Sequence, residues 1–214
     1  MPNVKYLFFH TAAADIPNVD AKEIDKWHKA RGFSGIGYHY VIIDDRHHSK
    51  EDGEVEMGRP ENRVGAHVLG VNEISLGVCC VGHGDRRDFT QKQKRSLVRL
   101  LAELARKYNV KTKNILGHRE VNKLIEQGKV AEEYRTDKSC PGNRVRTEEI
   151  RELVARELGE SVPEMAQAQN KQLGLNDLKA ALELIAENES ALGNATPEWR
   201  AFYNNGEIRG IVQA

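Results

Sequence analysis

Short apolar runs recur along the first 160 residues, and longer stretches between them carry an apolar side chain every three or four positions. The runs at residues 4–9, 37–45, 64–68 and 75–81 have the length and composition of strands. The segment VKTKNILGH leads back toward the same sheet and ends at His118. The dipeptide Asp52-Gly53 predicts a hairpin turn after the second run.

Capping residues mark where the helices begin. Asp20 with Glu23, and Thr90 with Gln93, have the spacing of capping boxes. A third helix is predicted from Thr147 until shortly before Gly159, and a short one at residues 121–127. Because strands alternate with helices, we expect an α/β fold in which helices cover a mixed central β-sheet.

The composition changes near Ser161. We expect a folded domain at residues 1–159, a polar linker at 160–174 and a small helical module at 175–214. Leucines and isoleucines between Leu175 and Leu192 follow roughly two heptads, short of the three or four that indicate a coiled coil. This stripe makes a homo-oligomer possible, and the role of the module is left open.

Charge and hydropathy exclude several partners. Lys plus Arg equals Asp plus Glu at 32 each, so no global basic field favours nucleic acid. No run approaches the ~18 apolar residues of a membrane span. The start, MPNVKYLFFH, is too short for a signal-peptide core and no cleavage site follows it. We therefore expect synthesis in the cytoplasm without a signal peptide, no nucleic-acid partner and no membrane insertion.

Three residues with metal-binding side chains stand where apolar runs give way to turns: His10, His118 and Cys140. Residues at the ends of neighbouring strands converge at one edge of a sheet, where α/β proteins usually bind ligands. Two imidazoles and one thiolate would leave the fourth position of a tetrahedral zinc open, as in catalytic sites. Spacing alone does not separate this hypothesis from structural histidines and a buried thiol.

Five blocks occur in one order that resembles a known family: FFHTAAA, WHKARGFSGIGYHYVI, VGAHVLGVNEISLGVCCVG, LGHREV and DKSCPG. Over residues 4–158 the chain resembles the type 2 family of zinc-dependent N-acetylmuramoyl-L-alanine amidases, which includes phage amidases and peptidoglycan recognition proteins. The resemblance implies a mixed sheet covered by helices. It also implies one Zn²⁺ per chain, with His10, His118 and Cys140 as ligands.

The resemblance further implies two catalytic residues, Tyr38 and Lys138. Both would stabilise the negative charge that develops on the amide oxygen during attack by a zinc-activated water. From the pattern alone, Tyr38 is typical of a core tyrosine and Lys138 of a solvated loop charge. His67 is a candidate for the wall of the substrate groove. His39 is expected to face away from Tyr38 and either to support the site residues from behind or to be structural. The remaining histidines are expected at the surface: His28, His47, His48 and His83.

The implied function is hydrolysis of the bond between N-acetylmuramic acid and L-alanine in peptidoglycan, by a phage endolysin that is held in the host cytosol until a holin opens the membrane. A muropeptide-recycling amidase and a non-catalytic peptidoglycan-binding module are the alternatives. The first usually has Asp as its third ligand, and the second typically lacks the Cys. Binding to a phage RNA polymerase, which uses an N-terminal extension in similar amidases, is disfavoured here.

The long segment between His118 and Cys140 is expected to form one wall of the cleft.

Overall fold

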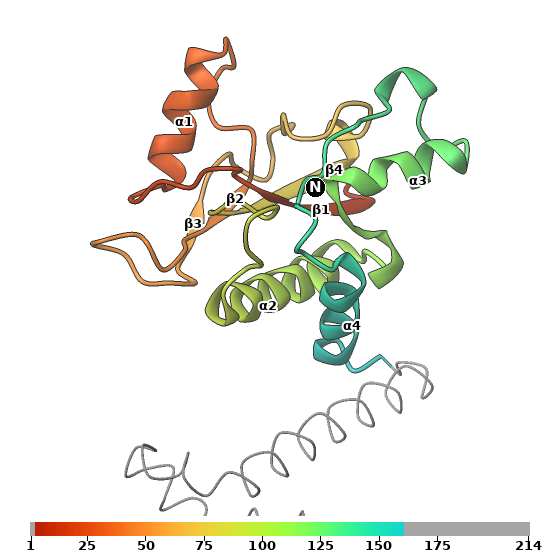
Figure 1. Ribbon diagram of the computed structural model, residues 1–214. Helices are drawn as coiled ribbons and strands as arrows, with labels where there is room; N and C mark the ends of the chain where they lie inside the picture. Colours follow the sequence, from red (N-terminus) through yellow and green to blue (C-terminus); the bar gives the residue numbers. More distant parts are fainter. Residues whose placement is uncertain (1–2, 161–214) are drawn as a thin grey trace, which may run out of the picture. The chain divides into compact units, whose positions relative to one another are not determined.

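The computed structural model describes residues 3–160, which form a central sheet with helices on both faces (Figure 1). The sheet has five strands in the order β3-β2-β4-β1-β5. Strands β2, β4, β1 and β5 run parallel, and β3 pairs antiparallel with β2 at the edge. The predicted α/β fold with a mixed sheet is confirmed.

The strands are short and mostly buried: β1 (Tyr6–Thr11), β2 (Tyr40–Ile42), β3 (Val55–Met57), β4 (Ser75–Cys80) and β5 (Ile115–Gly117). All residues of β1, β4 and β5 are buried, as expected for parallel strands that are covered on both faces. The predicted turn between β2 and β3 is present, with Gly53 at a φ of +84°.

One face of the sheet is covered by α2 (Gln91–Tyr108) and α4 (Thr147–Glu157), which appear below the sheet in Figure 1. The capping box of Thr90 and Gln93 is formed at the start of α2. Leu97, Leu101 and Leu104 then pack toward Leu7 and Val78 of the sheet in the largest apolar cluster. Because this cluster holds the middle of β1 and β4, it fixes the strand ends that carry the candidate site.

The other face is covered by α1 (Ala21–Ala30) and α3 (Val121–Glu126). Asp20 caps α1 by accepting a hydrogen bond from the backbone N–H of Glu23. Cys79 packs on the α1 side of the sheet and Cys80 on the α2 side, which confirms that the adjacent cysteines point to opposite faces. Short 3-10 turns lie at Asn72–Ile74, Thr112–Asn114, His118–Glu120 and Glu132–Tyr134.

The strand predicted at residues 64–68 is wrong, because this segment is an irregular loop. The side-chain oxygen of Asn72 accepts hydrogen bonds from the backbone N–H groups of His67 and Val68, both at 2.9 Å. Those two donors are therefore unavailable to a sheet ladder. The predicted second strand at residues 37–45 is also shorter in the structure, so that Tyr38 lies before β2 rather than inside it.

The predicted linker at 160–174, apart from its first residue, and the predicted helical module at 175–214, including the stripe between Leu175 and Leu192, lie outside the described residues. Within the described part of the chain, no helix combines the length and apolar character that crossing a membrane requires.

Candidate metal centre and active site

The sheet brings the three predicted metal ligands to one edge. His10 is the penultimate residue of β1, where it is fully buried. His118 directly follows β5, the parallel neighbour of β1. Cys140 approaches from the loop before α4, and its Sγ atom lies 3.7 Å from Nδ1 of His10. The convergence arises because β1 and β5 end at the same edge of the sheet.

The spacing of these side chains fits a tetrahedral zinc. One potential ligand atom from each of the three residues lies within 4.8 Å of the other two. The ring centroids of His10 and His118 are 4.9 Å apart. Usual Zn–N and Zn–S bond lengths imply an N···S separation of ~3.6 Å at a tetrahedral ion, close to the 3.7 Å between Cys140 and His10. Among residues 3–160 this is the one such cluster of His, Cys, Asp or Glu side chains.

The electrostatic environment keeps both imidazoles neutral. Burial, followed by the nearby His118, His67 and Lys138, lowers the pKa of His10 well below its usual value. Burial and the Lys138 charge lower the pKa of His118 to about 4. Burial raises the pKa of the Cys140 thiol to about 11, against the effects of Thr11 and Lys138. Metal binding would therefore have to release a proton from Cys140, as it commonly does from cysteine ligands.

Arg119 holds the Cys140 loop next to His118. Its backbone N–H donates to the carbonyl of Cys140 at 2.8 Å. Its guanidinium donates to three further carbonyls: Ser139 at 2.9 Å, Gly142 at 2.7 Å and Val145 at 2.9 Å. One residue thus ties two candidate ligands together. This role of Arg119 was not predicted from the sequence, although Arg119 directly follows a proposed ligand in LGHREV.

The loop after β4 holds the same segment from its other side. Asp85 accepts hydrogen bonds from the hydroxyl of Ser139 and the backbone N–H of Asn143, both at 2.7 Å. These two bonds hold the pKa of Asp85 below its usual value. A Cβ atom at Gly84 would lie 1.8 Å from the carbonyl oxygen of Pro141, so the close approach of the two loops requires glycine there. No local sequence pattern signals this contact.

Tyr38 and Lys138, the two predicted catalytic residues, both line the same cavity as His118 and Cys140. The ring of Tyr38 lies 5.0 Å from that of His10, centroid to centroid. Burial raises the pKa of the Tyr38 phenol well above its usual value, so the hydroxyl keeps its proton. Lys138 is exposed, and no ion-pair partner lies near it among the described residues.

The histidines around the cluster have different surroundings. His67 lies in the cavity wall and is buried, with 8% of its surface exposed. His39 is buried and structural, as predicted, since its ring contacts the backbone of Gly77 and Arg63. The prediction of a surface position for His28 is wrong. It is 6% exposed and lines the cavity. Its Nδ1 accepts a hydrogen bond from the backbone N–H of Gly37 at 2.8 Å, which holds the ring in this position.

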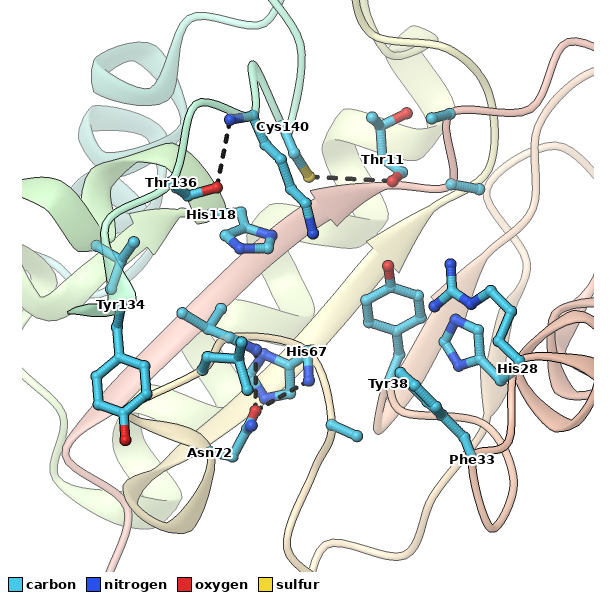
Figure 2. Close-up of a pocket in the computed structure, with 18 of the residues that line it drawn as sticks. Thr11, His28, Phe33, Tyr38, His67, Asn72, His118, Tyr134, Thr136 and Cys140 are labelled. Carbon is cyan, nitrogen blue, oxygen red and sulfur yellow. Dashed lines mark hydrogen bonds between the residues drawn. The ribbon is translucent and has the colours of Figure 1, made fainter.

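The cavity has a volume of about 690 Å³. Figure 2 shows His118 and Cys140 on one side of it, Tyr38, His28 and Phe33 on the other, and His67 with Asn72 between them. The segment between His118 and Cys140 contributes one wall, as predicted, with side chains that include Tyr134, Arg135 and Thr136. The cavity is large enough for several residues of an extended substrate. His118 and Cys140 line it, and the fully buried His10 lies behind them in contact with Cys140.

Comparison with known proteins agrees with this geometry. The family model described as N-acetylmuramoyl-L-alanine amidase matches residues 1–143. Over 108 residues the chain is 42% identical to the endolysin of Escherichia phage T7, an alignment that covers 48% of this chain and 67% of that one. The endolysin of Klebsiella phage KP32 is 39% identical over an alignment of the same length.

Solved structures share the fold. The N-acetylmuramoyl-L-alanine amidase LysC from Clostridium intestinale matches with a TM-score of 0.57 and 31% identity, over 74% of this chain and 87% of that one. Bumblebee PGRP-SA has the same fold, with a TM-score of 0.53 and 21% identity, over 76% of this chain and 86% of that one. Since the family model spans most of the chain and includes all three candidate ligands, this protein belongs to the N-acetylmuramoyl-L-alanine amidase family.

Proposed function

We propose that this chain is an endolysin that hydrolyses the amide bond between N-acetylmuramic acid and L-alanine in peptidoglycan. Membership of the amidase family and the similarity to phage endolysins support this function. The observation that carries it is the convergence of His10, His118 and Cys140 beside Tyr38 in an open cavity.

The three convergent residues would hold one zinc ion. Two neutral imidazoles and one thiol that can lose its proton are a donor set typical of zinc, and three protein ligands leave a coordination position free. When bound, zinc supplies Lewis-acid polarisation of the substrate carbonyl and a bound water with a lowered pKa.

Tyr38 and Lys138 would act on the developing charge. As water attacks the amide carbon, the carbonyl oxygen of the substrate becomes negative. Both the Tyr38 hydroxyl and the Lys138 ammonium can donate hydrogen bonds to this oxygen. A single donor of this kind contributes about 10²–10³ in rate. The protonated state of buried Tyr38 suits this role, because an ionised phenol would repel the oxyanion.

The alternatives of a recycling amidase and a binding module are less well supported. A cysteine at position 140 differs from the Asp that recycling amidases usually have. A module that only binds peptidoglycan needs neither Cys140 nor a neutral His pair at a shared site. Release through a holin to reach the cell wall completes the proposed role.

Products distinguish these functions directly. Purified protein is incubated with isolated cell walls, and the soluble products are analysed by mass spectrometry. We expect peptides with free L-alanine amino termini, and glycan strands of unchanged length. New reducing sugar ends, or no released peptide, would contradict the amidase assignment. The Cys140→Ser variant serves as the control for a contaminating hydrolase.

A further inference from the structure

His67 contacts the candidate ligand His10 on the side that faces away from Cys140. The Nε2 atom of His10 lies 3.2 Å from Nδ1 of His67, and both side chains are buried. The opposite ring nitrogen of His10, Nδ1, is the atom that lies 3.7 Å from Sγ of Cys140. The two nitrogens of His10 therefore have separate surroundings, one toward the metal centre and one toward His67.

This arrangement favours the tautomer of His10 that metal binding through Nδ1 requires. If Nδ1 of His10 binds the metal, its proton must be on Nε2, because a neutral imidazole carries one N–H. That N–H then points at Nδ1 of His67, which accepts it. Metal-binding histidines almost always donate their second N–H to a fixed acceptor, which sets the ring orientation and raises the basicity of the ligand. Here the acceptor is a second imidazole instead of a carboxylate or a carbonyl.

Two glycines make room for the His67 ring. A Cβ atom at Gly77 would lie 2.6 Å from Cγ of His67, and one at Gly65 would lie 2.6 Å from Cδ2. His39 packs edge-on against the same ring, with centroids 5.7 Å apart. The backbone N–H of Gly77 donates to Nδ1 of His39 at 3.0 Å, which fixes that neighbour in turn. The ring of His67 is thus confined beside His10.

We propose that His67 is a positioning residue that accepts the Nε2–H of His10 and so holds this ligand ready for the metal. The inference rests on the proposed zinc site and extends it to a residue that the sequence suggested as a substrate contact. The confinement by Gly65 and Gly77 favours a role through His10, since a buried ring in a fixed slot has little freedom to follow a substrate.

Two substitutions separate positioning from packing. His67→Phe keeps an aromatic ring in the slot and removes the acceptor. His67→Asn keeps an acceptor, because its Oδ1 is as many bonds from Cβ as Nδ1 of histidine is. The zinc dissociation constant of each purified full-length variant is measured by competition with a chromogenic chelator. We expect about 10–100-fold weaker zinc binding for His67→Phe, and a value near wild type for His67→Asn.

Kinetics with cell-wall fragments at saturating zinc give the second readout. Positioning predicts an unchanged KM for both variants. A raised KM with unchanged zinc affinity would overturn the inference and make His67 a substrate contact. Equal zinc affinity of wild type and His67→Phe would also overturn it, whereas a wild-type protein that binds no zinc would instead refute the proposed function.

The wild-type protein provides a test that does not depend on a variant folding. Nitrogen-15 spectra of the histidine side chains report which ring nitrogens carry protons. With zinc bound, the proton of His10 is expected on Nε2 and Nδ1 of His67 is expected to be an unprotonated acceptor. A proton on Nδ1 of His67 would contradict the proposed hydrogen bond.

Discussion

Replacing Arg119 tests how the third ligand is held in place. Arg119→Met keeps a long apolar stem but removes the guanidinium, which donates to the carbonyls of Ser139, Gly142 and Val145. The backbone hydrogen bond to Cys140 would remain. The substitution therefore loosens the loop without deleting any proposed ligand.

The expected loss of stability follows from those bonds. A hydrogen bond to a charged group contributes about 1.5–3 kcal/mol net. Because this loop is half-exposed and water can replace part of what is lost, we expect ~2–4 kcal/mol for all three bonds together. For a folded unit of this size, 1 kcal/mol shifts Tm by roughly 2–4 °C. The melting temperature of Arg119→Met should thus fall by roughly 5–15 °C.

Urea unfolding of the zinc-free protein measures the free energy, and chelator competition measures zinc affinity. Arg119→Lys should recover only part of the loss, since an ammonium cannot reproduce the planar fork of donors. Arg146→Met is the matched control, because Arg146 is largely exposed and pairs with Glu149 at the surface; we expect a change below about 0.5 kcal/mol. If Arg119→Met and Arg146→Met lost the same stability, and zinc affinity were unchanged, the Arg119 contacts would not hold the Cys140 loop.

Three further predictions concern the catalytic donor, the loop contact and the half-buried carboxylate of Glu61. Tyr38→Phe should lower kcat by about 10²–10³ with unchanged zinc affinity; a kcat near wild type would remove Tyr38 from the mechanism. Gly84→Ala places a Cβ atom 1.8 Å from the carbonyl oxygen of Pro141, so unfolding experiments should show a loss of ~1–3 kcal/mol, together with weaker zinc binding. Although burial raises the pKa of Glu61, hydrogen bonds from Lys107, Tyr108 and Tyr40 hold it below its usual value. A depressed folded pKa contributes stability above the unfolded pKa of ~4.3, and this is lost as pH falls through the folded value. Glu61→Gln should therefore cost more stability at pH 6 than at pH 3, and an equal cost at both would contradict this.

The parts of the fold with local signals could be predicted. The helices α1 and α2 begin at Asp20 and Thr90, because a capping side chain and its partner are three residues apart in the sequence. The strand β4 was recognisable because its residues are apolar on both faces. These elements depend on residues that are close together in the sequence, so the sequence pattern is enough to predict them.

The errors involve hydrogen bonds between side chains and backbone groups, which the pattern of apolar and polar residues does not contain. Residues 64–68 have a strand-like composition, yet two of their backbone N–H groups donate hydrogen bonds to the side-chain oxygen of Asn72 instead of to a neighbouring strand. His28 is polar and was expected at the surface, yet it is buried, and its Nδ1 accepts a hydrogen bond from the backbone N–H of Gly37. The roles of Arg119 and Asp85 arise only where loops from different parts of the chain meet. The candidate ligands were identified through family resemblance, because their spacing carries no local motif.

Zinc reconstitution tests the central claim most directly. Zinc is removed from the purified protein with a chelator, and amide cleavage in isolated cell walls is followed as zinc is added back. We predict that activity is absent without metal and reaches its plateau at one zinc per chain, and that Cys140→Ser neither binds zinc tightly nor recovers cleavage. Full cleavage by the zinc-free protein, or tight binding of one zinc by Cys140→Ser, would contradict a metal centre formed by His10, His118 and Cys140.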